Sequence, residues 1–148
     1  LYKKGILIGL GTDAYTNDML ESIKVALCSQ RHNACMPNVG WCEVTDMLFR
    51  NNAKMAERTG FPTLGVLKPG AAADVIVMDY KPFTPFSDAN IDGHMLFGMT
   101  GRQCQTTMIN GRILMKDRVL TEIDEEAGNA HILESSKRLW GRLNHKEY

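Results

Sequence analysis

The feature that most constrains the fold is a short run near the start of the chain, Gly5 to Gly11, with the sequence GILIGLG. Apolar residues occupy both alternating faces of this run, which is typical of a parallel strand covered on both sides. A polar loop over 12–18 and a stretch of helical periodicity follow, with Asp18 as the expected N-cap and Glu21 as its capping-box partner. The sequence therefore predicts one βα unit, which cannot close a parallel sheet by itself.

The pattern changes from helix to strand near Phe61-Pro62. Before that point, a second helix is expected from about Thr45 to Gly60. After it, a type I′ hairpin turn is expected at Asn110-Gly111. The expected strands are 74–80, 106–109, 112–115 and 119–120. These strands make a poor independent sheet, so both halves of the chain look incomplete.

The last stretch, which begins with Asp124, predicts a terminal helix. Acidic residues lie at its start and basic residues at its end, as the helix dipole favours, and its apolar stripe includes Trp140. This stripe suits either packing within the chain or a dimer contact. The expected organisation is α/β, with a βαα piece over 1–60, a β-rich piece over 61–122 and a terminal helix over 123–148.

Composition and charge exclude several classes of protein. Charged residues make up 23% of the chain and hydrophobic residues 44%, which is typical of a globular domain and not of a disordered chain. The 17 basic residues balance the 17 acidic ones and form no basic stripe, so nucleic acid is not expected as a partner. The longest apolar stretches are far shorter than the roughly 20 residues that span a bilayer, so no membrane anchor is expected.

The cysteines and the first residues indicate a compartment and a boundary. Cys28, Cys35, Cys42 and Cys104 form no C-x-x-C pair, and a chain of 148 residues does not need a disulfide framework. A reducing, cytoplasmic location is therefore expected. The chain starts without Met and runs at once into the apolar segment, so we expect a fragment whose amino-terminal part is missing.

Asp13 lies just beyond the predicted strand, where α/β barrels and sheets place functional groups. Its carboxylate suits a divalent metal ion or proton transfer. From the local pattern alone, a turn-capping role is the simpler interpretation. Tyr15 and Asn17 lie on the same loop and are candidate substrate-binding residues, with a solvated loop as the alternative.

Three blocks of sequence occur in a particular order along the chain. They are Ile8 to Asp13 (IGLGTD), Leu64 to Asp79 (LGVLKPGAAADVIVMD) and Met108 to Arg112 (MINGR). In this order they resemble the carboxy-terminal third of the amidohydrolase superfamily. The similarity is greatest to its aminohydrolase and chlorohydrolase branch, including the aminohydrolases associated with selenium metabolism.

The resemblance implies the carboxy-terminal part of a (β/α)₈ barrel, with Ile6 to Leu10 as the eighth strand, and part of a small β-sandwich. It implies that Asp13 is a ligand of a single zinc or iron ion and the catalytic base that takes a proton from the metal-bound water. The implied activity is metal-dependent hydrolysis of C–N or C–Cl bonds, such as deamination of a purine, pyrimidine or triazine. A small-molecule substrate and a homo-oligomer are expected.

The other metal ligands of that family have no counterpart in this sequence. The family uses a His-x-His pair, further His residues and a catalytic Glu, whereas the 4 His residues here form no such pair. Because a catalytic zinc site usually has three protein ligands, we expect this chain alone to be inactive. A non-catalytic scaffold or interaction protein with this fold is the alternative, and retention of Asp13 favours the enzyme.

Two further groups of residues carry weaker signals. His32, Cys35 and Cys42 are too few and too irregularly spaced for a metal site, so free thiols are expected. Asn51 and Asn52 lie inside the second predicted helix, where hydrogen bonds to neighbouring backbone are the expected role.

Overall fold

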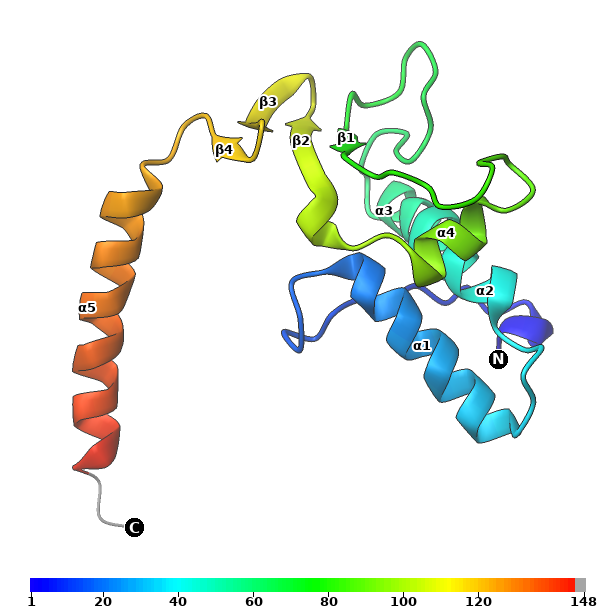
Figure 1. Cartoon of the computed structure of the whole chain (residues 1–148), viewed down its shortest axis with the longest axis horizontal. Coiled ribbons are helices and arrows are strands. Elements are labelled where there is room, and N and C mark those ends of the chain that lie inside the picture. The colour runs from blue at the N-terminus through cyan, green and yellow to red at the C-terminus, as the bar shows by residue number, and fades with distance from the viewer. Residues whose placement is uncertain (146–148) are drawn as a thin grey trace.

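The computed structural model describes residues 1–145, so the last three residues of the predicted segment 123–148 lie outside it (Figure 1). In chain order the elements are a 3₁₀ turn (Tyr2–Lys4), α1 (Met19–Ala34), α2 (Trp41–Asp46), a π-helical turn (Met47–Asn51), α3 (Asn52–Arg58), β1 (Val75–Met78), α4 (Ile91–Phe97), a 3₁₀ turn (Gly101–Gln103), β2 (Cys104–Ile109), β3 (Arg112–Lys116), β4 (Val119–Leu120) and α5 (Glu125–Asn144). Helices α1 to α4 lie together, the sheet lies beside them, and α5 extends away from both.

Helix α1 confirms the first predicted helix and its N-cap. The Asp18 carboxylate accepts hydrogen bonds from the backbone N–H groups of Leu20 and Glu21, which otherwise have no partner at a helix start. The predicted capping box is wrong in detail. Glu21 accepts a hydrogen bond from the Thr16 hydroxyl at 2.6 Å, and that hydroxyl accepts the backbone N–H of Asp18 at 3.1 Å. The Thr16 hydroxyl therefore bridges Asp18 and Glu21, in place of the direct contact that a capping box would have.

The second predicted helix exists, but its start lies four residues earlier, at Trp41 in place of Thr45. The Thr45 side chain does not cap a helix end, because its hydroxyl donates to the Cys42 carbonyl inside the helix, at 3.0 Å. The helix continues from α2 through a π-helical turn into α3 and ends at Arg58, two residues before Gly60.

The sheet has four strands in the order β1-β2-β3-β4, and every neighbouring pair is antiparallel. All four predicted strands are confirmed within a few residues. The predicted hairpin turn is also confirmed, because Asn110 and Gly111 have φ values of 49° and 79°, as a type I′ turn requires.

The core is small and lies among α1, α2 and α4. It consists of Ile23 and Leu27 from α1, Val44 from α2 and Leu96 from α4. The sequence pattern does not predict α4, which has only seven residues and contains Gly93. Its place is decided by tertiary packing of Leu96 against α1, which no local pattern reveals.

The segment Ile6 to Leu10 corrects the expectation of a strand at this position. In residues 1–145 it belongs to no strand of the sheet. A parallel strand exists only beside hydrogen-bonded neighbours, and the one sheet of the described residues is built entirely from segments after residue 74. The apolar pattern of the segment therefore predicts an element whose sheet partners are not among these residues.

The exposed surface of the chain is unusually large. It amounts to 11266 Å², whereas a folded monomer of this length is expected to expose about 7,600 Å². Helix α5 contributes to the difference because none of its described residues is buried, and Ile132 and Trp140 are 61% and 60% exposed.

In the described part of the chain, no helix has the length and apolar character needed to cross a bilayer.

Candidate active site

The segment that leads to Asp13 is held by the side chains of two consecutive asparagines. Asn51 Nδ2 donates to the Ile8 carbonyl at 2.8 Å. The carboxamide of Asn52 contacts Leu10 twice, accepting its N–H at 3.0 Å and donating to its carbonyl at 2.9 Å. The expectation that these asparagines bond to backbone is confirmed.

Gly9 lies between these contact points and allows the close approach. A Cβ atom at this position would overlap Oδ1 of Asn52 and would lie 2.9 Å from Met55 Sδ. Only glycine therefore lets the segment and α3 lie this close together.

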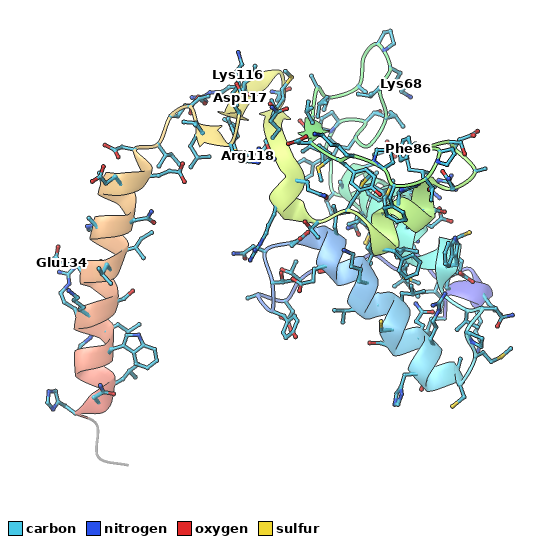
Figure 2. All side chains as sticks on the ribbon, in the orientation of Figure 1. Lys68, Phe86, Lys116, Asp117, Arg118 and Glu134 are labelled. Atoms are coloured by element: carbon cyan, nitrogen blue, oxygen red, sulfur yellow. The ribbon has the colours of Figure 1, made fainter. Side chains whose placement is uncertain are left out.

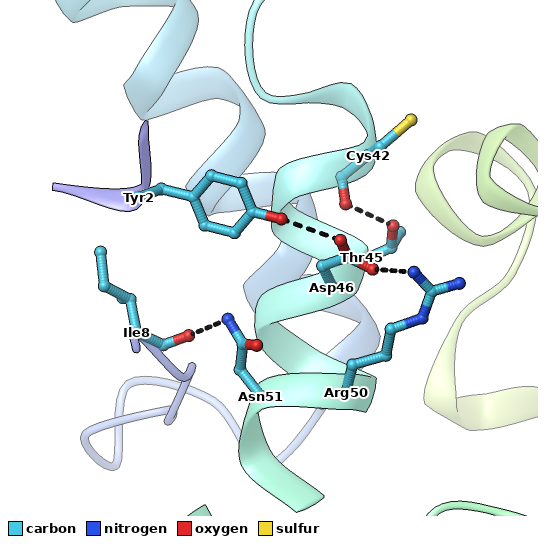
Figure 3. A network of polar contacts seen from close by, with 7 residues as sticks. All are labelled: Tyr2, Ile8, Cys42, Thr45, Asp46, Arg50 and Asn51. Carbon is cyan, nitrogen blue, oxygen red and sulfur yellow. Dashed lines mark hydrogen bonds and ion pairs between the residues drawn. The ribbon is translucent and has the colours of Figure 1, made fainter. Parts of the chain in front are cut away.

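A third contact ties the start of the segment to the same helix (Figure 3). The Tyr2 hydroxyl donates to Asp46 at 2.8 Å, and Arg50 pairs with the same carboxylate at 3.0 Å. The hydrogen bond to Asp46 raises the pKa of Tyr2, because it stabilises the protonated phenol. From Tyr2 to Leu10, the chain therefore runs along the helix from Asp46 to Asn52.

Asp13 lies in a tight turn directly after this segment. Asp13 and Ala14 have φ values of 49° and 58°, and the Tyr15 N–H donates to the Thr12 carbonyl at 2.9 Å. Two consecutive left-handed residues closed by this bond form a type I′ turn. Asp tolerates this conformation better than Ala does, so Ala14 is the strained position. The Asp13 side chain is exposed, and within residues 1–145 its carboxylate makes no hydrogen bond that orders the turn.

The far end of the loop is anchored to the start of the sheet. One oxygen of Asp18 caps α1, and the other accepts the N–H of Gly101, just before β2, at 2.7 Å. A groove of about 1100 Å³ lies at this junction and is lined by the start of α1, by Ile76 and Met78 of β1, and by Thr100 to Arg102. Asn17 lines this groove.

The three predicted site residues are not gathered in one pocket. Asn17 lines the groove, whereas Tyr15 is 82% exposed and neither it nor Asp13 is among the residues that line it. The positions of these residues along the loop do not predict this separation, because the turn at Asp13 and Ala14 changes the direction of the backbone.

The donors present do not fit a complete metal site. No group of three His, Cys, Asp or Glu side chains in residues 1–145 is placed to hold a metal ion, and Asp13 alone falls short of the three protein ligands of a catalytic zinc. The expected free thiols are confirmed for Cys35 and Cys42. Desolvation by neighbouring atoms, with the nearby carboxylates of Asp92 and Glu43, raises the pKa of the exposed Cys42 thiol and so disfavours the thiolate that binds metals.

One buried polar residue has more contacts than the sequence suggests. His94 of α4 is only 4% exposed, and its two ring nitrogens lie 2.6 Å from the Tyr80 hydroxyl and 3.1 Å from the Thr84 hydroxyl. Phe83 and Phe86 lie against the same ring. These contacts hold the 80–86 segment on α4, and no local sequence signal distinguishes this histidine from an exposed one.

Known proteins are similar in sequence to most of this chain. The family model described as "Amidohydrolase family" matches residues 1–114. The chain is 29% identical to a 5'-deoxyadenosine deaminase of Methanosarcina barkeri, over 97% of this chain and 34% of the relative. It is 31% identical to a 5-methylthioadenosine/S-adenosylhomocysteine deaminase of Halothermothrix orenii, over 93% of this chain and 33% of the relative. The chain thus spans about a third of the length of these curated relatives.

A solved structure matches the fold at lower sequence identity. The atrazine chlorohydrolase of Arthrobacter aurescens, complexed with zinc, superposes with a TM-score of 0.63 at 24% identity, over 88% of this chain and 30% of that one. This likeness shows the fold, which is that of the carboxy-terminal part of a metal-dependent hydrolase barrel with its accompanying small sheet. With the family model matching more than three quarters of its residues, the chain belongs to the amidohydrolase family.

Proposed function

We propose that this chain is part of a hydrolase that replaces an amino or chloro group on a ring carbon of a cyclic amidine. The observation that carries the proposal is Asp13, an exposed carboxylate at the end of a segment clamped to helix α3, in a chain of the amidohydrolase family. Relatives named as adenosine-type deaminases support a purine as the first substrate class to examine. The chlorohydrolase neighbour supports a triazine as the second.

Asp13 has two roles in this proposal. Its carboxylate supplies one oxygen ligand to a zinc or iron ion whose other ligands come from outside this chain, because the described residues do not provide them. A divalent ion held there would supply hydroxide near neutral pH. Within hydrogen-bond reach, the Asp13 carboxylate would take the proton of the attacking water. It would return that proton to a leaving amine, or release it to solvent when chloride leaves. Tyr15 and Asn17 are proposed to contact substrate from the same loop.

The proposal also concerns the assembly in which the chain functions. We infer that it acts as one part of a longer protein, and that the amino-terminal part of that protein covers much of the excess surface. The chain alone is then inactive. The four free thiols support a reducing, cytoplasmic location. A homo-oligomer, with the apolar stripe of α5 as a contact, is part of the same proposal.

The experiment compares two aspartates in the full-length protein that contains this chain. Asp117 matches Asp13 in φ, with 51° against 49°, and lies in the turn between β3 and β4, outside the loop that carries Asp13 (Figure 2). Asparagine tolerates this conformation, so Asp13→Asn and Asp117→Asn both preserve the backbone and remove one carboxylate. We expect release of ammonia or chloride to fall at least about a thousandfold for Asp13→Asn and to stay unchanged for Asp117→Asn, because Asp13 is both ligand and base.

The substrates are 5'-deoxyadenosine, 5'-methylthioadenosine and a chlorotriazine. Ammonia release from the first two assigns a deaminase, and chloride release from the third assigns a dechlorinase. A full-length protein that turns over none of them, with Asp13→Asn behaving as wild type in metal content, would favour the scaffold or interaction protein and overturn the proposal.

A further inference from the structure

We propose that Asn51 and Asn52 are positioning residues that set the location of Asp13. This inference rests on the proposed function of Asp13. Neither asparagine touches the turn that carries Asp13; both act through the backbone that precedes it.

The contacts hold the backbone of the segment, while the Leu10 side chain packs against the core. Asn52 uses its acceptor and its donor on the N–H and C=O of a single residue, Leu10, as a neighbouring strand residue would. Asn51, only 8% exposed, adds the carbonyl of Ile8. The two carboxamides therefore satisfy three backbone groups of the segment.

A π-helical turn over Met47–Asn51 lies directly before Asn52. Such turns are frequent at functional sites. Both carboxamides reach the same segment, Asn51 at Ile8 and Asn52 at Leu10.

We expect the position of Leu10 to be transmitted to Asp13 because the path between them is short. Only two residues separate them, and the turn closes at once through the bond from Tyr15 N–H to Thr12 C=O. Beyond the turn, Asp18 is fixed by its cap and by its bond to Gly101. With the downstream end anchored at Asp18, we expect a shift of Leu10 to reach Asp13. A misplacement of about 1 Å in a catalytic group can cost about a hundredfold in rate.

The test uses Asn52→Ala and Asn51→Ala in the full-length protein, with Asn129→Ala on the exposed face of α5 as a control. Asn52→Asp is the isosteric variant, since it keeps the acceptor for Leu10 N–H but places an oxygen against the Leu10 carbonyl. We measure kcat and KM, the melting temperature, and hydrogen exchange of the amides of Leu10 and Tyr15.

We expect Asn52→Ala to lower kcat at least about tenfold with KM unchanged. Exchange at Leu10 should become about fivefold faster, which corresponds to one lost hydrogen bond. Hydrogen exchange at the Tyr15 amide should also become faster, because the backbone that precedes the turn is no longer held by Asn52. In the Asp13→Asn background, Asn52→Ala should lower the residual rate no further, since it acts through Asp13.

Two results would overturn the inference. The first is faster exchange at Leu10 with unchanged exchange at Tyr15 and unchanged kcat, which would make the asparagines a structural contact only. The second is unchanged exchange at Leu10. If wild type turns over no substrate, the proposed function fails, and exchange at Tyr15 still decides whether the asparagines position the turn.

Discussion

Replacing Gly9 by alanine perturbs the packing of the amino-terminal segment on α3 with a single added carbon. That carbon would overlap Oδ1 of Asn52 and lie 2.9 Å from Met55 Sδ, a separation that real Cβ atoms essentially never show. The Asn52 carboxamide cannot yield cheaply, because Leu10 holds it at both ends, whereas the flexible Met55 side chain can move aside. Either the carboxamide leaves Leu10 or α3 moves away from the segment.

The magnitude follows from the bonds at stake. Two hydrogen bonds contribute about 0.5–1.5 kcal/mol each, and overpacking adds about 1 kcal/mol or more. We therefore expect Gly9→Ala to lower the free energy of unfolding by about 2–4 kcal/mol. The assay is urea denaturation of the full-length protein, followed by far-UV circular dichroism.

Gly11 provides the matched control, since it lies two residues along the same segment with open space around its Cβ position. Gly11→Ala should leave stability within about 0.5 kcal/mol of wild type or raise it slightly. Adding Asn52→Ala to Gly9→Ala should recover part of the loss, because the clash disappears with the side chain. Equal unfolding midpoints for Gly9→Ala and Gly11→Ala would refute the reasoning.

Two further predictions concern polar contacts elsewhere in the helical part. His94→Leu leaves the hydroxyls of Tyr80 and Thr84 without their partner, so the unfolding free energy should fall by about 1–3 kcal/mol, and a melting curve like that of wild type would contradict this role. The bond to Asp46 raises the pKa of Tyr2 above its ordinary value of 10.0, so its stabilising contribution is full below that pH and is lost as pH rises through the higher folded value. Tyr2→Phe should therefore lessen the decline of stability at alkaline pH, and an identical decline in both proteins would count against the contact.

Several elements were predictable because their signals are local. Asp18 caps α1 and Asp124 caps α5 through backbone N–H groups two or three residues ahead. Asn110-Gly111 forms the hairpin turn because these residue types adopt positive φ at low cost. In each case the deciding atoms belong to residues adjacent in sequence.

Other features depend on contacts between distant residues, and no local pattern contains them. Thr45 has the residue type of an N-cap, yet the helix begins before it because α2 is buried against α1 and α4. Helix α4 forms around Leu96 and His94, whose partners lie elsewhere in the chain. The apolar segment before Asp13 has a strand pattern but no strand neighbour in the described residues.

For the candidate site, the sequence by itself determined the carboxylate, its place after an apolar segment and the order of blocks that indicates the amidohydrolase family. Whether Asp13 is catalytic stays a prediction. Only the tertiary structure decided that Asn51 and Asn52 hold that segment, that Gly9 admits them, and that Asn17 faces a groove apart from Asp13. The physical reason is that residue types and spacing specify short-range hydrogen bonds, whereas contacts across some 40 residues exist only once the helix has packed on the segment.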